Sequence, residues 1–472
     1  MTFFELKNFI NPSISLAQQR RQWGVQFLKA FLAVFLGYMA MYFIRNNFKV
    51  AGPLLKEQLD MTTTELGLIG LSFSITYGGC KALVGFYIDG KNTKKFLAVL
   101  LGLSALSVLA MGLVMSYFGS PIGILMTLWG LNGLFQTSGG PASYSTLSRW
   151  TPKEKRGRFL GLWNMSHNVG GGLAGVIALW GANQFFDGNV VGMFIFPSII
   201  ALIIALLTFW LGKGDPRELG WARAEEIFGE PVADVDKDCQ ESKWAIVKKH
   251  VLLNPFVWIL CISNIFVYII RIGVDNWAPL YVAEQFNWSG ADVVNTILYF
   301  EMGALVASLL WGYISDLLHG RRAIVAVGCF VLIIFALISY RYATSVFMVN
   351  ASLAALGLLI FGPQLMITIS LVDFVPKNAV SVTTGLSGVF AYLLGDSIAK
   401  VYLAMIADPE KPGVSFFHTT LHGWHDVFVV FYCCVFMGIV LLSVVAFAEE
   451  KRIRREKRQA LSSLENSVTP ST

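Results

Sequence analysis

The stretch GYMAMYFIRNNF, Gly37–Phe48, places an arginine near the end of an apolar run that begins at about Phe31. A guanidinium inside a membrane helix costs about 2.5–3.5 kcal/mol on insertion scales, so it is kept where it faces a wet cavity or binds a ligand. This arginine, Arg45, has no acidic residue within one helical turn. The stretch therefore predicts a membrane helix that carries a functional cation.

A second copy of this arrangement lies further along the chain. The segment VYIIRIG, Val267–Gly273, repeats MYFIRNN, so Arg271 corresponds to Arg45 at an offset of 226 residues. The pattern Gly-x3-Asp-x4-basic-basic starts at Gly85 and again at Gly312, an offset of 227 residues. Two motifs with nearly one offset indicate two similar halves. Arginines that meet at the axis between such halves suit a doubly charged anion, and phosphate fits best.

Two other interpretations of these arginines remain open at this level. Either side chain could extend along the helix to a membrane interface. Arg271 could instead form a structural ion pair with Asp275, which lies one helical turn further on.

The composition is that of a polytopic membrane protein. Hydrophobic residues make up 55% and charged residues 14% of the 472 residues, and mean hydropathy is +0.61. This length accommodates about twelve spans of ~20 residues with their loops. The six cysteines show neither metal-ligand nor disulfide spacing, so we expect no metal and no cofactor. No cleaved signal peptide is visible in the polar N-terminal segment.

The apolar runs fall into two groups of six on either side of a charged segment. We predict a first helical bundle within residues 1–212, a linker at 213–254, a second bundle at 255–448 and a basic tail at 449–472. The predicted helices lie near 28–48, 66–88, 96–117, 121–147, 158–183, 190–212, 255–282, 293–315, 323–341, 346–372, 380–406 and 426–448.

The distribution of basic residues predicts the orientation. With the N-terminus inside, 28 of the 36 Lys and Arg residues fall in inside segments. Four fall in outside loops, among them Lys49 and Lys56, and four within the membrane. Because inside loops carry the excess of basic residues, both termini are expected in the cytoplasm. The net charge of +6 therefore reports topology, and we expect no nucleic-acid partner.

Further polar residues interrupt the apolar helices. Asn164, His167 and Asn168 share one helix face by their spacing, and an intramembrane histidine is a candidate functional group. Lys81 needs either an acid, for which Glu301 is the candidate, or a place in the cavity. Asp396 and Lys400, four residues apart, are expected to pair with each other. Tyrosines that suit a polar cavity fall in the same helices: Tyr38, Tyr42, Tyr77, Tyr268 and Tyr392.

The two Gly-Asp-basic motifs lie in inside loops. Asp89 and Asp316 fall at helix ends beside basic residues, where a carboxylate could bind a neighbouring helix when the cytoplasmic side is closed and release it when that side opens. We therefore assign them a gating role. The alternative is that these loops only anchor the topology.

Several stretches resemble a known family. MYFIRNNF, WNMSHNVGGG (Trp163–Gly172), VYIIRIGVDNW (Val267–Trp277) and FAYLLGDSIAK (Phe390–Lys400) are similar to the organophosphate:inorganic phosphate antiporters of the major facilitator superfamily, in particular its hexose-phosphate members. The resemblance covers nearly the whole chain. It implies an all-α membrane protein with 12 transmembrane helices in two pseudo-symmetric six-helix bundles around one site.

The resemblance also implies a function. The chain would take up sugar phosphate, such as hexose 6-phosphate, in exchange for inorganic phosphate by alternating access, as a monomer in a bacterial inner membrane. Arg45 and Arg271 would grip the phosphoryl group, with further contacts from His167 and Lys81. The cavity would be lined by Tyr38, Tyr42, Tyr77, Tyr268, Asn164 and Tyr392.

One stretch departs from the family. Hexose-phosphate members carry an acid and a lysine before FAYL, where this chain has TTGLSG with Thr384 and Ser387. The alternatives are therefore a transporter-like receptor that senses external sugar phosphate, or a proton symporter that uses Glu301, Asp275 or Asp396. An enzyme such as a phosphatase is not expected, because the sequence shows no paired nucleophile and acid.

Overall fold

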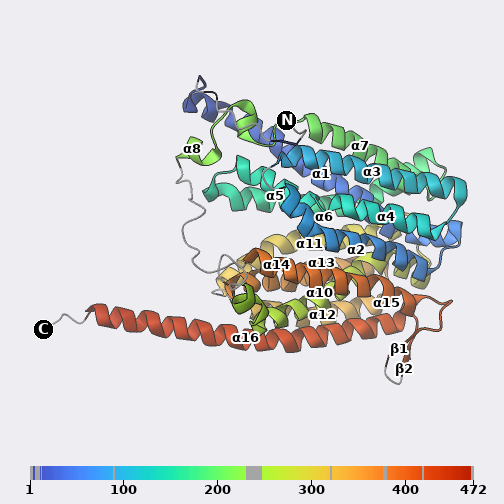
Figure 1. The fold of residues 1–472 in the computed structure, drawn as a ribbon. Helices are drawn as coiled ribbons and strands as arrows, with labels where there is room; N and C mark the ends of the chain where they lie inside the picture. The colour runs from blue at the N-terminus through green and yellow to red at the C-terminus, as the bar shows by residue number, and fades with distance from the viewer. Residues whose placement is uncertain are drawn as a thin grey trace.

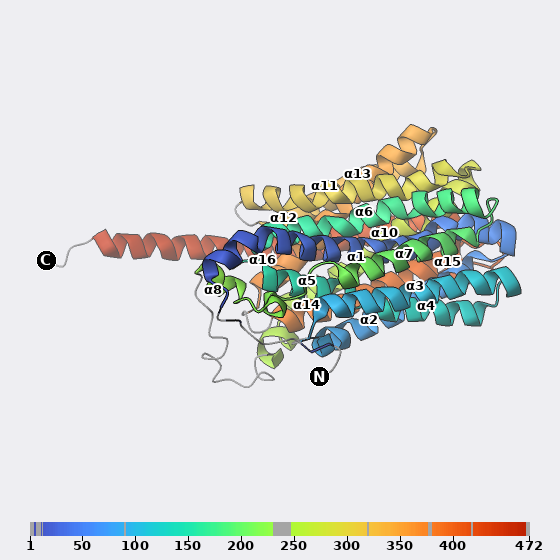
Figure 2. The same cartoon turned by 90° about the horizontal axis from the view of Figure 1, so that it is seen from above.

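A computed structural model describes the chain except residues 1–3, 6–10, 12, 89–90, 230–246, 319–320, 376–379, 417–418 and 469–472. Long helices run side by side along one direction, and the first and second halves of the chain form two neighbouring groups (Figure 1). Figure 2 shows the same alignment of helices after a turn of 90°. The fold is that of an all-α membrane protein.

The described residues of the first half form seven helical elements, of which the fourth and fifth follow each other across a two-residue turn. Their bounds are α1 (Leu16–Leu59), α2 (Thr63–Ile88), α3 (Thr93–Phe118), α4 (Ile122–Gln136), α5 (Gly139–Trp150), α6 (Lys153–Phe185) and α7 (Gly192–Trp210). A short 3-10 helix at Pro216–Leu219, α8 (Ala224–Phe228) and a π-helical turn at Lys248–Leu252 occupy described parts of the linker.

The second half repeats this plan. Its elements are α10 (Pro255–Phe286), α11 (Ala291–Leu317), α12 (Arg322–Arg341), α13 (Val346–Asp373), α14 (Val380–Val389), α15 (Ser397–Ala407) and α16 (Trp424–Val468), and a π-helical stretch at Phe390–Asp396 joins α14 to α15. A small antiparallel hairpin, β1 (Val414–Phe416) and β2 (Thr419–Leu421), precedes α16. The backbone of α16 continues as a helix well beyond the bundle (Figure 1).

Within the described residues, nine helices are long and apolar enough to cross a membrane. The three other predicted segments lie in α2, in α4 with α5, and in α6, which are rich in glycine and polar residues. Glycines allow membrane helices to approach closely. A side chain at Gly303 of α11 would overlap the backbone of Ala354, and one at Gly357 of α13 would overlap that of Phe300. The contact between α11 and α13 therefore depends on these two glycines.

The first helix is longer than its apolar run indicates. It was expected to end at about residue 48, but α1 continues to Leu59 through Pro53, with a local distortion at Ile44 (φ −97°, ψ 17°). The expectation that Lys49 and Lys56 lie in an outside loop is therefore wrong, because both lie in α1. Both lysines of these extra turns pair with acidic residues of the second half, as described below.

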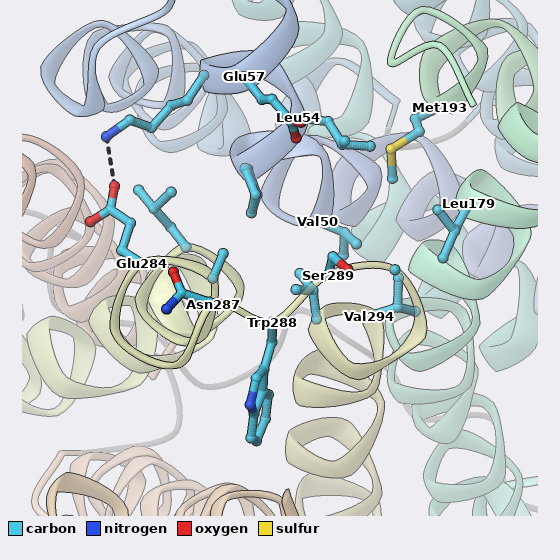
Figure 3. Close-up of a pocket in the computed structure, with 16 residues that line it drawn as sticks. Val50, Leu54, Glu57, Leu179, Met193, Glu284, Asn287, Trp288, Ser289 and Val294 are labelled. Carbon is cyan, nitrogen blue, oxygen red and sulfur yellow. Dashed lines mark hydrogen bonds and ion pairs between the residues drawn. The ribbon is translucent and has the colours of Figure 1, made fainter. Parts of the chain in front are cut away.

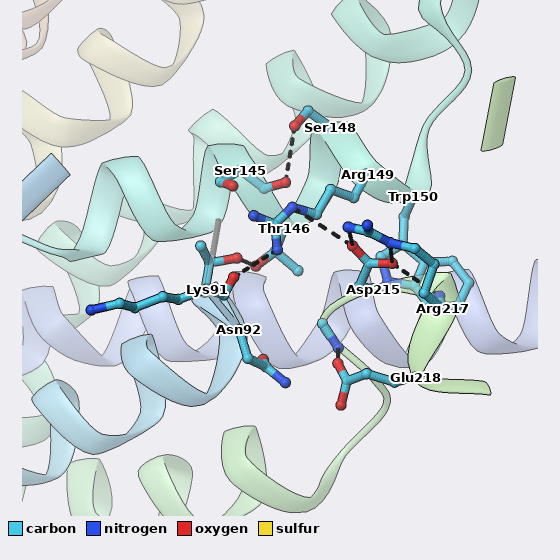
Figure 4. Close-up of polar contacts among 12 residues, drawn as sticks. Lys91, Asn92, Ser145, Thr146, Ser148, Arg149, Trp150, Asp215, Arg217 and Glu218 are labelled. Atoms are coloured by element: carbon cyan, nitrogen blue, oxygen red, sulfur yellow. Dashed lines mark hydrogen bonds and ion pairs between the residues drawn. The ribbon is translucent and has the colours of Figure 1, made fainter. Parts of the chain in front are cut away.

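The first part of the linker is folded against the first half of the chain. Asp215, whose side chain is 2% exposed, binds Arg217 and lies 3.8 Å from the guanidinium of Arg149 at the end of α5. Arg149 also donates to the carbonyl of Lys91, after α2, at 2.8 Å. Figure 4 shows this network, in which the linker, α5 and the loop after α2 are tied together.

A cluster of tryptophans lies beside this network. The rings of Trp23, Trp150 and Trp221 have centroids 5.0–6.3 Å apart. The indole of Trp150 donates to the carbonyl of Lys213 at 2.9 Å. Aromatic packing of this kind is worth about 0.5–1.5 kcal/mol per pair beyond burial. The linker from residue 213 to residue 228 is thus part of the first half rather than a free tether.

Candidate functional site

The two arginines of the repeat line one cavity between the halves. Arg45 of α1 and Arg271 of α10 both border it, together with Tyr42, Tyr268 and Tyr392. They occupy corresponding positions of corresponding helices, so the pseudo-symmetry of the sequence brings them to the same place. The geometry provides two guanidinium groups for one anion.

Arg45 is held by aromatic rings. Its guanidinium carbon lies 4.7 Å from the ring centroids of both Phe73 and Tyr77, and 5.4 Å from that of Tyr42. Cation–π contacts of about 0.5–2 kcal/mol each offset part of the cost of the buried charge. Arg45 makes no hydrogen bond or ion pair with any residue that the structure describes. Its N–H groups are therefore available to a ligand.

Arg271 is held differently. Its Nη1 donates to Oε1 of Gln364 on α13 at 2.9 Å, and its guanidinium carbon lies 4.3 Å from the ring of Phe361. Its buried Nε has no hydrogen-bond partner in the described part of the chain. The alternative that Arg271 pairs with Asp275 is wrong, because Asp275 forms its ion pair with Lys49 of α1. Arg271 keeps donors for a ligand.

A second, wider cavity adjoins the arginines. Its volume is about 280 Å³, and it shares Tyr42, Arg271 and Tyr392 with the first. Of the residues predicted from the sequence, it is also lined by Tyr38, Asn164 and His167. The ring of His167 lies 5.5 Å from that of Tyr42. The two cavities together offer room for an anion at the arginines and for an attached neutral group beyond them.

Lys81 and Tyr77 surround Tyr392 of the second half. Lys81 Nζ lies 5.3 Å and 5.2 Å from the rings of Tyr77 and Tyr392, whose centroids are 5.2 Å apart. Of the two alternatives for Lys81, the pairing with Glu301 is wrong. Glu301 accepts instead from Asn168 Nδ2 at 2.9 Å and Asn46 Nδ2 at 3.4 Å. Amides satisfy this carboxylate because α11 packs against α6 and α1.

Asp396 and Lys400 pair with each other at 3.1 Å, as their spacing predicts. Lys400 Nζ also donates to Ser74 Oγ of α2 at 2.7 Å. Both charged side chains are buried, and Lys400 borders the cavity of the two arginines. The pair therefore belongs to the contact between α2 and α15 as well as to the edge of the site.

Ion pairs between the halves extend away from the arginines toward the end of α1. Lys49 binds Asp275, and Lys56 binds Glu284 at 2.6 Å. Beside the second pair is a cavity of about 450 Å³, which is bordered by Val50, Glu284, Trp288 and neighbouring residues (Figure 3). This end of the helices is thus held together across the two halves.

The remaining predicted positions lie elsewhere. Asp89 is outside the described residues, as is the side chain of Asp316, so their gating role stays a prediction. Ser387, in the uncharged TTGLSG stretch, accepts from Asn264 Nδ2 at 2.9 Å. Neither cavity is lined by it. Helix α14 therefore contributes a packing contact at this position.

Sequence reasoning missed several residues of the cavities. The wider cavity is also lined by Gln364, Thr368 and Ser308. The rings of Phe73 and Phe361 pack against the guanidinium groups of the two arginines. Gln364 had a signal, because a glutamine inside an apolar helix is costly and marks a functional position. The two phenylalanines had none, since an aromatic residue in a membrane helix is usually packing.

Comparisons with known proteins agree with this arrangement. Residues 34–399 match the model of the Major Facilitator Superfamily. The hexose-6-phosphate:phosphate antiporter of Salmonella typhimurium is 46% identical over 448 residues, which cover 94% of this chain and 96% of that protein. The phosphoglycerate transporter protein of the same organism is 32% identical, and the match covers 94% of this chain and 93% of that protein.

A solved structure shows the same fold at low identity. A bacterial homologue of the human lysosomal transporter Spinster superposes with a TM-score of 0.65 at 14% identity, covering 90% of this chain and 96% of that chain. The match of the family model spans most of the chain, and it includes both arginine-bearing helices. The chain therefore belongs to the Major Facilitator Superfamily.

Proposed function

We propose that this protein is a secondary transporter that takes up hexose 6-phosphate in exchange for inorganic phosphate. The observation that carries the proposal is the cavity shared by Arg45 and Arg271, whose free donors suit a phosphoryl group. The antiporter of Salmonella typhimurium, similar over nearly its full length, supports the choice of substrates.

The buried charges explain why exchange is obligatory. An empty site holds two guanidinium groups in one low-dielectric cavity, and closing the protein around them is unfavourable. A bound dianion neutralises them and lowers the barrier between the two open states. The carrier therefore changes state with phosphate or sugar phosphate bound, and it does so slowly when empty.

The two helical groups provide the alternating access. With the N-terminus in the cytoplasm, the ion pairs Lys49–Asp275 and Lys56–Glu284 lie on the outer side of the site. They hold that side closed, while the wider cavity lies toward the cytoplasm. Opening to the outside requires these pairs to separate.

The rival mechanisms fit less well. A proton symporter needs a carboxylate that is free to gain and lose a proton at the site. Asp275 and Asp396 are each paired with a lysine, so they do not meet this requirement. Glu301 accepts from two neutral amides and has no ion pair among the described residues, so sugar-phosphate uptake in the absence of a pH gradient is the test that excludes it. A receptor would bind sugar phosphate without exchange, so it is separated from the transporter by experiment.

Vesicles containing the purified protein and loaded with phosphate test the proposal. We expect labelled glucose 6-phosphate to enter only vesicles that contain phosphate. An Arg45→Lys variant replaces the planar fork by a point charge, and the loss of one charge-assisted hydrogen bond predicts a decrease of about tenfold to 100-fold in uptake. Binding without exchange in the parent protein would indicate a receptor, and equal uptake into empty vesicles would refute the antiport.

A further inference from the structure

We propose that Gln364, Thr368, Ser308 and Asn164 form a subsite for the hydroxyl groups of the sugar. This inference rests on the proposed function and specifies which part of the site recognises the neutral half of the substrate. All four residues line the wider cavity beside Arg271. Gln364, Thr368 and Ser308 belong to the second half, and Asn164 faces them from α6 of the first.

The orientation of the Gln364 amide follows from its neighbour. Arginine has donors and no acceptor, so the atom of Gln364 that faces Arg271 must be the carbonyl oxygen. The amide nitrogen then points away from the guanidinium. It lies 3.5 Å from the hydroxyl of Tyr268, a long contact, and offers a donor to a ligand. Gln364 therefore lies between Arg271, which we propose binds the phosphoryl group, and the rest of the wider cavity.

The hydroxyl groups of Thr368 and Ser308 serve as acceptors, in contrast to the amide nitrogen of Gln364. Thr368 Oγ1 donates to the carbonyl of Gln364 at 2.9 Å, and Ser308 Oγ donates to the carbonyl of Leu305 at 2.8 Å. Because each hydroxyl has used its one hydrogen within its own helix, it presents acceptor lone pairs to the cavity. A donor and two acceptors together suit sugar hydroxyls, which both donate and accept.

The spacing on α13 indicates the size of the ligand. Thr368 follows Gln364 by one helical turn, a rise of about 6 Å. This is comparable with the width of a pyranose ring, so a hexose held by its phosphoryl group at Arg271 reaches Thr368. A three-carbon phosphate presents fewer hydroxyl groups than a hexose phosphate and therefore uses fewer contacts of the subsite. The cavity of about 280 Å³ is close to the lower limit for small-ligand sites, about 300 Å³.

The location of the subsite explains how a chain with an uncharged TTGLSG stretch can still select a sugar. Ser387 of α14 accepts from Asn264 and lines neither cavity, so the neutral polar groups that face the wider cavity from the second half lie on α13 and α11. The polar groups of the subsite are neutral. They therefore affect recognition of the hydroxyl groups without altering the charge that binds phosphate.

Exchange in phosphate-loaded vesicles tests the subsite with Thr368→Val and Ser308→Ala. The matched control is Thr127→Val, since Thr127 is exposed on α4 and makes the same backbone hydrogen bond, to Gly123, at 2.8 Å. Gln364 is left unchanged, because its loss would also release Arg271. Three rates are measured: phosphate against phosphate, glucose 6-phosphate against phosphate, and glycerol 3-phosphate against phosphate.

We expect each subsite variant to raise the half-saturating concentration of glucose 6-phosphate by about threefold to tenfold, the effect of one hydrogen bond. Phosphate exchange should remain at the parental level, and glycerol 3-phosphate should be affected less than glucose 6-phosphate. Unchanged glucose 6-phosphate kinetics in both variants would overturn the subsite. An equal decrease in all three rates would also overturn it. A parent protein that exchanges nothing would refute the proposed function instead.

Discussion

The ion pair Lys49–Asp275 offers a direct test of how the two halves are held together. The pair joins α1 to α10, and both side chains are largely buried, with 12% and 7% exposure. Lys49→Met leaves the carboxylate of Asp275 buried without its partner. Removing one member of a buried pair costs about 3–5 kcal/mol. In the proposed mechanism the two residues separate when this end of the helices opens, so the cost applies to the closed state alone.

The expected consequence is a shift between conformations. A change of about 3–5 kcal/mol alters the ratio of two states by roughly 10²-fold to 4 × 10³-fold. Spin labels on cysteines introduced at Glu57 and Ser289, which border the cavity beside the Lys56–Glu284 pair (Figure 3), would measure it. We expect the distance distribution of Lys49→Met to move from short to long separations, with a slower exchange rate.

The pseudo-symmetry supplies a stringent control. Lys49 and Asp275 are separated by 226 residues, the same offset as the two arginines. The two positions are therefore equivalent, and the swapped variant Lys49→Asp with Asp275→Lys should restore the short distances and much of the exchange. Lys29→Met removes an exposed lysine of the same helix and should change neither. Unchanged distances in Lys49→Met, or no recovery in the swap, would refute the reasoning.

Three further predictions concern packing, pH and ligand binding. Gly303→Ala forces a methyl group against the Ala354 backbone and should cost about 1–3 kcal/mol, seen as a lower melting temperature in detergent. Gly328→Ala, with open space around it, should not lower it. Burial raises the pKa of Asp215, but hydrogen bonds from Arg217 outweigh it, and its pKa lies below the ordinary 3.8. Its contribution to the docking of the linker is therefore complete above pH 3.8 and is lost as pH falls through the folded pKa. Amide hydrogen exchange over residues 213–221 should therefore accelerate in the parent protein below this pKa. In Asp215→Asn it should already be faster at neutral pH. Inorganic phosphate at 100 times its dissociation constant should stabilise the parent by about 2.7 kcal/mol, and a matching gain in Arg271→Lys would contradict the role of that side chain.

The sequence alone predicts the main features of this architecture, because the membrane imposes strong rules. Apolar runs located the helices, and one repeated offset identified the two halves and their arginines. The end of α1 was misjudged because hydropathy cannot recognise a lysine whose charge is neutralised by another helix. Lys49 looks like a loop residue until Asp275, 226 positions away, is placed beside it. For the same reason the partner of Arg271 was not predictable, since Gln364 reaches it from α13.

The pairs Arg45–Arg271 and Lys49–Asp275 each occupy equivalent positions across the pseudo-twofold axis, but they have opposite effects. Residues 45 and 271 are both arginines, so the axis brings like charges together, and they repel until an anion lies between them. One helical turn further along the same helices, residues 49 and 275 are a lysine and an aspartate, which attract without any ligand. The same symmetry thus makes the centre of the protein depend on a bound anion, and it makes the end that carries Lys49 and Asp275 close without one. Ligand binding and closure of this end can therefore be varied separately, by substitutions at positions only four residues apart.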